Sequence, residues 1–168
     1  MKRTINAIIL TVIGLALSAT ANATAFTDHM ENKIIDAVFR GQSLGAPTTW
    51  YVGLDTVACT ETGGGTEVSG GGYARVAVSA SLAAWAGTQS SGSTTASSGT
   101  GGTTSNNAAI TFPAPTAAWG SIVSFRLWDA STSGNAWICQ ALTTAKTINS
   151  GDAAPVFNAG SLTIQSDN

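Results

Sequence analysis

The sequence contains little charge and only one histidine. Charged residues make up 10% of its 168 residues, with 7 Lys and Arg against 9 Asp and Glu, which gives a formal net charge of −2. The basic residues outside the first few positions are scattered and form no stripe: Lys33, Arg40, Arg75, Arg126 and Lys146. A protein that binds nucleic acid concentrates such residues on one face, so we predict no nucleic-acid partner.

The residues that catalysis or metal binding would need are also missing. The single histidine, His29, has no second histidine or cysteine at zinc-ligand spacing. The glycine-rich stretch 63–72 lacks the Gly-Lys-Ser/Thr ending of a phosphate loop, and no Gly-x-Ser-x-Gly elbow has a suitable His partner. We therefore predict no enzyme, no metal and no cofactor. A secreted hydrolase would require two of the dispersed carboxylates to converge in a cleft: Asp55, Glu61, Glu67, Asp129 and Asp152.

The first 23 residues have the three-part layout of a secretory signal peptide. Met1-Lys2-Arg3 is a short basic start, Ile5 to Leu17 is mostly apolar, and Ala21-Asn22-Ala23 ends the segment with small residues. This layout predicts cleavage after Ala23, which would leave residues 24–168 as one extracellular domain with a net charge of −4 and no membrane contact. The apolar run is too short for a comfortable permanent span. A retained amphipathic or membrane-anchoring N-terminus is the alternative.

Two cysteines remain, and their state depends on the compartment. In an exported protein Cys59 and Cys139 would form one disulfide, whereas in a protein assembled in the cytoplasm they would be free, buried thiols. The sequence does not decide between the two, because a disulfide requires the Cα atoms to approach closely.

One helix is predicted over residues 28–40. Asp28 is the expected N-cap, Glu31 completes a capping box, and Gly41 follows as the stop signal. Apolar residues recur at helical spacing and give the helix a broad apolar face: Phe26, Met30, Ile34, Ile35, Val38 and Phe39. This face either covers one end of a sheet or mediates contact between subunits.

After Gly41 the pattern changes from a period near four to a period of two. Alternating runs predict strands at residues 48–55, 73–79, 121–129, 136–142, 145–148 and 161–165. Trp50, Val52 and Leu54 share one predicted face. Short strands with Gly- or Pro-rich breaks favour an all-β fold, an antiparallel β-sandwich or jelly-roll-like domain with one N-terminal α-helix. The Gly/Ser/Thr segment 87–107 is predicted to be a flexible loop, or one ordered by a neighbouring subunit.

Some side chains that alternation directs outward are candidates for contacts with other molecules. Trp128 is predicted to share a face with Ser124 and Arg126, where it would pack in a second layer, form a subunit interface or contact a ligand. Together with the helix face, the predicted assembly interface comprises Met30, Ile34, Ile35, Val38, Tyr73, Arg75, Arg126 and Trp128.

Several segments occur in an order that resembles one known group of proteins. These are MENKIIDAVFRGQ, WYVGL, GGYARVAV, SNNAAITFPAPTAAWGSIVSFRLWDA, GNAWICQAL and INSGDAAPVFNAGSLTI. The most specific parts are Tyr73-Ala74-Arg75-Val76, the Trp119-Gly120 step and the Gly160-x-Leu162 ending. The order resembles that of small tail fibre-like or virion structural proteins of tailed phages and prophages, over essentially all of Phe26 to Gln165. The resemblance implies a structural role and no catalytic residues.

The sequence thus predicts a non-enzymatic structural protein that assembles with copies of itself. The setting would be a phage tail or virion, with other virion proteins as partners, or an exported extracellular filament. The alternative is an adhesin or receptor-binding module that recognises a glycan or protein on a host surface, with Trp128 or the Gly/Ser/Thr loops at the contact.

Overall fold

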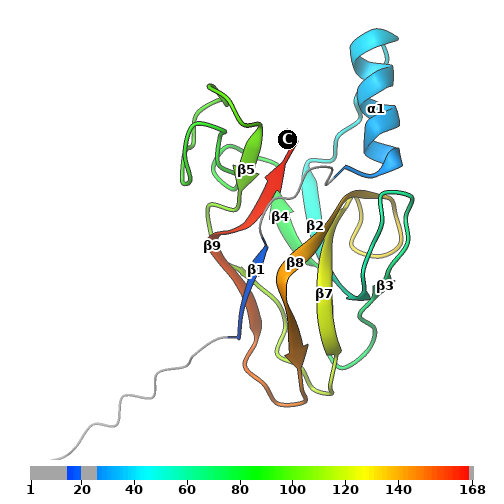
Figure 1. Ribbon diagram of the computed structural model, residues 1–168, viewed down its shortest axis with the longest axis vertical. Coiled ribbons are helices and arrows are strands. Elements are labelled where there is room, and N and C mark those ends of the chain that lie inside the picture. The colour runs from blue at the N-terminus through cyan, green and yellow to red at the C-terminus, as the bar shows by residue number, and fades with distance from the viewer. Residues whose placement is uncertain (1–14, 20–25, 167–168) are drawn as a thin grey trace, which may run out of the picture.

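The structure, a computed structural model, describes residues 15–19 and 26–166 and builds them into two packed sheets with one helix (Figure 1). The helix is α1 (Asp28–Phe39). The strands are β1 (Leu15–Ala19), β2 (Thr49–Val57), β3 (Thr66–Glu67), β4 (Val76–Ser79), β5 (Thr103–Ser105), β6 (Ile110–Thr111), β7 (Gly120–Trp128), β8 (Ala136–Ile148) and β9 (Pro155–Gln165).

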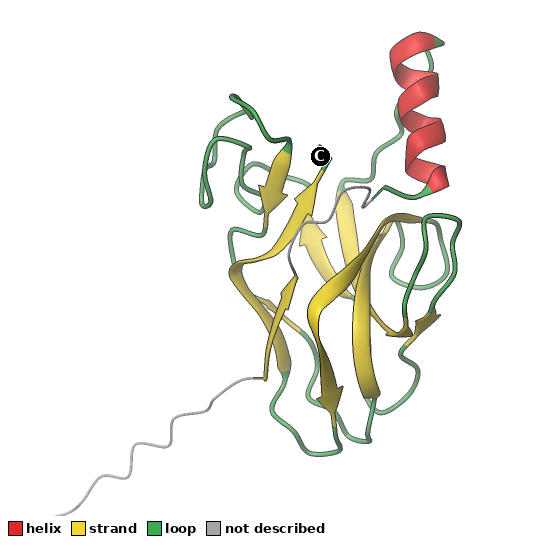
Figure 2. Cartoon of the chain, in the orientation of Figure 1, coloured by secondary structure: helices red, strands yellow, loops and turns green. Residues whose placement is uncertain are grey.

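The two sheets are built mainly from antiparallel pairs. The five-stranded sheet runs β3-β2-β7-β8, with β4 also paired to β2, and the four-stranded sheet runs β1-β9-β5, with β6 also paired to β9. Figure 2 shows strands and loops throughout the body, with the helix at one end. The predicted all-β sandwich with an N-terminal helix is therefore confirmed.

The hydrophobic core lies between the sheets. Val52 and Leu54 of β2 are fully buried, as their shared face predicts. The ring of Phe125 on β7 meets that of Phe157 on β9 with centroids 5.6 Å apart, which joins the two sheets. Trp119 closes one end: it is 5% exposed, and its Nε1 donates to the Gly71 carbonyl at 2.8 Å.

The prediction of two separate strands at 136–142 and 145–148 is wrong, because the single strand β8 spans both ranges. It pairs with β7 along its length, but the partner changes from Ala141 opposite Ser124 to Lys146 opposite Ile122. The extra residues form a bulge, and a bulge shifts which side chains face the core. Ile122 of β7, the register partner of Lys146, is fully buried.

The Gly/Ser/Thr segment is shorter as a loop than the range 87–107 predicts. Thr103–Ser105 forms β5 and pairs with β9. Asn106 is 1% exposed, and its side chain bonds to the Asn158 carbonyl at 2.8 Å and the Leu162 amide at 2.9 Å. A buried amide with these partners fixes the end of the segment to β9.

Residues 15–19 belong to the predicted leader, yet they form β1. Leu17 is 2% exposed and belongs to the core. The predicted cleavage site after Ala23 lies outside the described residues, so cleavage stays a prediction. Removal of residues 1–23 would take β1 away from β9.

Candidate interaction surfaces

Helix α1 is fixed to the sandwich at its first turn. The N-cap is Thr27 rather than the predicted Asp28: its hydroxyl accepts from the Met30 amide at 3.4 Å. The same hydroxyl donates to the Ala136 carbonyl of β8 at 2.7 Å, and Thr27 is 3% exposed. The His29 ring packs edge-on against Trp137 with centroids 5.1 Å apart. Thr27 therefore joins the helix start to β8.

The rest of α1 stands off from the body, as Figure 1 shows. None of the helix residues is buried. Ile35 is 49%, Val38 66% and Phe39 79% exposed. These three lie at i, i+3 and i+4, a spacing that places them side by side on one face. We call Ile35, Val38 and Phe39 the helix stripe. It is an exposed apolar surface on α1.

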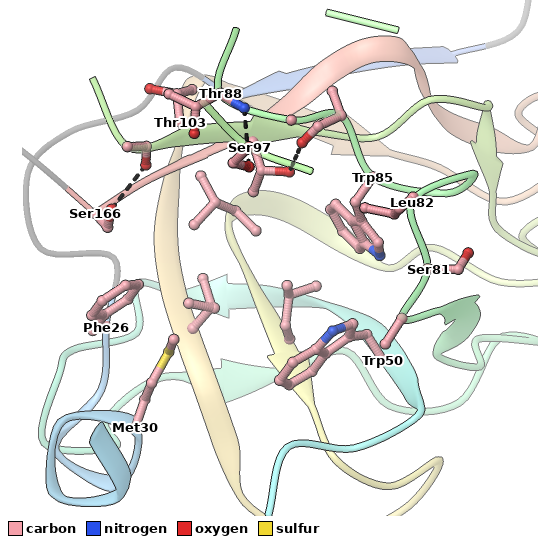
Figure 3. A pocket seen from close by; sticks show the side chains of 18 residues that line it. Phe26, Met30, Trp50, Ser81, Leu82, Trp85, Thr88, Ser97, Thr103 and Ser166 are labelled. Atoms are coloured by element: carbon pink, nitrogen blue, oxygen red, sulfur yellow. Dashed lines mark hydrogen bonds between the residues drawn. The ribbon is translucent and has the colours of Figure 1, made fainter. Parts of the chain in front are cut away.

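A pocket of about 660 Å³ opens between the base of α1 and the loop that leads to β5. In Figure 3, Phe26 and Met30 line one side of it, and Trp50, Leu82 and Trp85 line another. Its polar rim comes from the Gly/Ser/Thr segment, where the Thr88 amide donates to the Ser97 hydroxyl at 3.2 Å. Trp50 shares its predicted face with Val52 and Leu54. Leu82 and Trp85 follow a strand end and show no periodicity, so no sequence pattern identifies them as pocket residues.

A cluster of charged side chains lies on the face of the five-stranded sheet that is opposite to the core and the pocket. Asp55 is fully buried and forms an ion pair with Arg126, whose Nε donates to an Asp55 carboxylate oxygen at 3.0 Å. Glu67 pairs with Arg75 through two hydrogen bonds of 2.7 Å and accepts a third, of 2.8 Å, from the Tyr73 hydroxyl. We call these residues, with Trp128, the polar cluster.

Trp128 lies at the centre of the polar cluster. The guanidinium carbon of Arg75 is 3.8 Å from the centroid of the Trp128 ring, and that of Arg126 is 4.4 Å away, which is cation–π geometry. Gly53 makes room for this arrangement, because a Cβ there would stand 2.9 Å from Trp128 Nε1 and 2.8 Å from Glu67 Oε1. The close packing at position 53 therefore requires a glycine.

Residues 58–75, which we call the covering loop, fold over this face and enclose the cluster. The loop contributes Glu67, Tyr73 and Arg75, and its Gly64 carbonyl accepts from Arg126 Nη1 at 3.4 Å. Arg75 Nη1 also donates to the carbonyls of Ala130 and Ser133, each at 2.8 Å, and so ties the loop to the turn after β7. A face that alternation assigns to solvent is in this way covered by the chain itself.

The cluster shifts the pKa values of its acids in opposite directions. Burial raises the pKa of Asp55 above its ordinary value, although the Arg126 guanidinium opposes the shift. Burial also acts to raise the pKa of Glu67, but hydrogen bonds from Arg75 and Tyr73 hold it below its ordinary value. The pKa of Tyr73 is raised, first by burial and then by the nearby Glu67 carboxylate.

The predicted interface residues thus fall into two groups. Ile35 and Val38 are exposed on α1, whereas Ile34 is half-buried and Met30 packs against the core and lines the pocket. The prediction that Tyr73, Arg75 and Arg126 face outward is wrong. Trp128 packs in a second layer against Arg75 and Arg126, which is one of the three alternatives predicted for it. Arg126 is 6% exposed and Trp128 is half-buried, because the covering loop lies over them. Within the loop itself, Tyr73 is half-buried and the Arg75 side chain is 6% exposed.

Cys59 and Cys139 are joined in a disulfide with Cα atoms 5.8 Å apart. The bond links the start of the covering loop to β8. It also closes a loop of 80 residues in sequence, which in the chain-entropy account stabilises the fold by about 4 kcal/mol or more.

Asp55 and Glu67 are the acids that converge here, and each is neutralised by an arginine. Neither lines the pocket described above. In residues 15–19 and 26–166, no three His, Cys, Asp or Glu side chains gather in a way that could hold a metal ion. Over the same ranges, no helix has the length and apolar character needed to cross a membrane.

A known protein family matches nearly all of the described residues. No curated protein matches the chain. A family model described as podophage GP4 fiber I protein gp80 matches residues 25–165, a range that includes α1 and strands β2 to β8 and ends at the last residue of β9. Since the match spans most of the 168 residues, the chain belongs to the podophage fiber I protein gp80 family and is a tail fibre-like structural protein of the virion.

Proposed function

We propose that this protein is a non-enzymatic fibre subunit that associates with copies of itself through the helix stripe. The observation that carries the proposal is the exposure of Ile35, Val38 and Phe39 on a helix that stands off from the sandwich. Membership of a fibre family supports assembly with other virion proteins, and the stripe supplies a surface for it.

The energetics of α1 favour a partner. A free helix of 12 residues is marginal in water, because packing of an apolar face provides most helical stability in proteins. Here the first turn packs on β8, while the second half of the helix exposes its apolar side chains. Burial of a large apolar side chain contributes about 1.5–3 kcal/mol. Three of them in one interface would stabilise both the helix and the association.

Light scattering coupled to size-exclusion chromatography tests the proposal. We expect the unmodified protein to elute as an oligomer and the double variant Val38→Glu/Phe39→Glu to elute as a monomer with an unchanged β-sheet circular dichroism spectrum. Gln42→Glu is the matched control, since it adds a negative charge just beyond the helix at an exposed polar residue. A monomeric unmodified protein, or an oligomer that survives the double substitution, would overturn the proposal.

We place this assembly in the virion, which is where the family supports it. An exported filament subunit is the other setting, and it depends on the predicted cleavage after Ala23. Intact mass spectrometry distinguishes the two: protein taken from virions should retain residues 1–23, whereas a secreted subunit should begin at Thr24.

A second candidate function, recognition of a host-surface glycan or protein, is favoured by the pocket. Trp50 and Trp85 present aromatic surface there beside the hydroxyl-rich rim, a combination suited to a sugar ring. Saturable binding of labelled protein to host cells that is lost in Trp85→Ala and kept in Thr132→Ala, an exposed residue outside the pocket, would support it. Equal binding by both variants would refute it.

A further inference from the structure

The pairing of β1 with β9 differs from the other strand pairs. Strand β1 runs parallel to β9, with Leu15 opposite Pro155 and Leu17 opposite Phe157, whereas all other strand pairs in the described part of the chain are antiparallel. In Figure 1 it lies between β9 and β8, and in the strand order it is the end strand of the smaller sheet, next to β9. A single strand from the N-terminal part of the chain, added parallel to a sheet edge, has the geometry of strand addition.

The site that β1 occupies takes the Leu17 side chain into the hydrophobic core. Leu17 is 2% exposed and joins Phe157 and Leu162, both fully buried, in the core. Its neighbours Ala16 and Ser18 are exposed. In the sequence of β1, Leu15, Leu17 and Ala19 alternate with Ala16 and Ser18, and Leu17 provides the core contact.

Strands β1 and β9 also differ in whether the family match covers them; we call the matched residues, 25–165, the family domain. The family match begins at residue 25 and includes β9, so the acceptor strand lies inside the family domain and β1 lies outside it. Without β1, the edge of β9 would be unpaired and the space for Leu17 would be empty. An unpaired edge is a template for a strand from another chain.

We propose that this edge of β9 is a strand-acceptor site and that, in the assembled fibre, it binds residues Leu15–Ala19 of a second copy. This inference rests on the proposed self-association. Exchange preserves the contacts of β1 and is therefore a low-cost route to an oligomer. Donation from each copy to the next in one direction would produce an open chain, which is the form a fibre requires.

Cysteine cross-linking in the full-length protein tests the exchange. Ala16 and Val156 are register partners, Ala16 is exposed, and Val156 is half-buried. Both native cysteines are already in a disulfide, so the new thiols of Ala16→Cys/Val156→Cys would be the free pair. After mild oxidation we expect most of the protein to migrate as covalent oligomers on a non-reducing gel and as a single chain after reduction.

Thr111→Cys/Val156→Cys is the matched control, because Thr111 of β6 pairs with the same acceptor residue from within the family domain. This pair should cross-link within one chain and migrate as a monomer. A cross-link from Ala16→Cys that also stays within one chain would overturn the inference, as would a lack of cross-linking or an N-terminus that has been removed. If light scattering shows an oligomer while the cross-link is intrachain, only the strand exchange fails. If the protein is monomeric, the proposed self-association fails as well.

Discussion

Asp55 and Arg126 are buried opposite charges, and each offsets the cost of burying the other. Asp55 has no exposed surface, and Arg126 is its partner through Nε and Nη2. Removing charges from water costs several kcal/mol, and a close partner offsets this cost. Arg126 also donates to the Gly64 carbonyl, so the pair helps to fix the position of the covering loop.

Arg126→Met is expected to destabilise the protein by about 3–5 kcal/mol, since it leaves the buried Asp55 carboxylate without a counter-charge. Urea unfolding followed by tryptophan fluorescence measures the change. The double variant Asp55→Leu/Arg126→Met removes both charges and should recover most of the loss. A single variant as stable as the unmodified protein would show that Asp55 carries no charge in the folded state.

Glu67 should make the stability depend on pH. Because the folded state holds the pKa of Glu67 below its ordinary value of 4.5, this group adds stability above that pH and loses it as the pH falls through the lowered pKa. Glu67→Gln should therefore be less stable than the unmodified protein near neutral pH, and the difference should shrink on acidification.

Urea midpoints measured at several pH values, from about pH 7 to about pH 3, give this difference directly. Asp55 acts in the opposite sense, since its pKa is raised, but it is present in both proteins. A difference in stability that stays constant over the whole range would contradict the assignment. The hydrogen bond from Tyr73 to Glu67 would then be the main contribution, and Tyr73→Phe would reproduce it.

The sequence pattern correctly predicts that several of these side chains share a face, but it predicts that this face is exposed to solvent, and in the structure it is covered. Alternation in β7 predicts that Arg126 and Trp128 share a face, and in the structure the Arg126 guanidinium lies over the Trp128 ring. Alternation does not predict what covers that face. The covering loop is rich in glycine and lacks periodicity, so its contribution of Glu67 and Arg75 could not be read from the pattern.

Thr27 couples helix α1 to β8, and its loss should release the helix without unfolding the sheets. Thr27→Ala removes a buried hydroxyl that donates to Ala136 and caps the helix, a loss of about 1–2 kcal/mol. Hydrogen exchange should show faster exchange of the α1 amides, with β7 and β8 unchanged. Thr27→Ser keeps the hydroxyl and should behave as the unmodified protein. Uniform acceleration across the whole domain would instead show that the helix and the sheets unfold as one unit.

Elements with strong periodicity were predictable, and short ones were not. The helix pattern extends over three turns, and β2 and β7 each alternate over most of nine residues, so their existence follows from the sequence. Strands β3, β5 and β6 contain two or three residues each and exist because a longer neighbour pairs with them. Such strands are determined by tertiary contacts rather than by local preference.

The N-terminal segment shows how one stretch of sequence can satisfy two patterns. A mostly apolar run near a basic start is the signature of a leader, and the same apolar residues suit a buried strand. The structure uses Leu15–Ala19 as β1, so the completeness of the sandwich depends on whether this segment stays on the protein.

Leu17→Ala decides whether β1 is part of the folded protein, whichever copy donates it. If β1 occupies its site, the substitution leaves a cavity beside Phe157 and should cost about 2–5 kcal/mol in the free energy of unfolding. Ala16→Ser lies next to it on the exposed side and should change the stability by less than about 0.5 kcal/mol. Both variants are measured by urea unfolding on protein whose intact mass is known. If Leu17→Ala is as stable as Ala16→Ser, β1 contributes nothing to the fold. A mass that begins at Thr24 would give the reason, because cleavage would have removed the strand before the protein assembled.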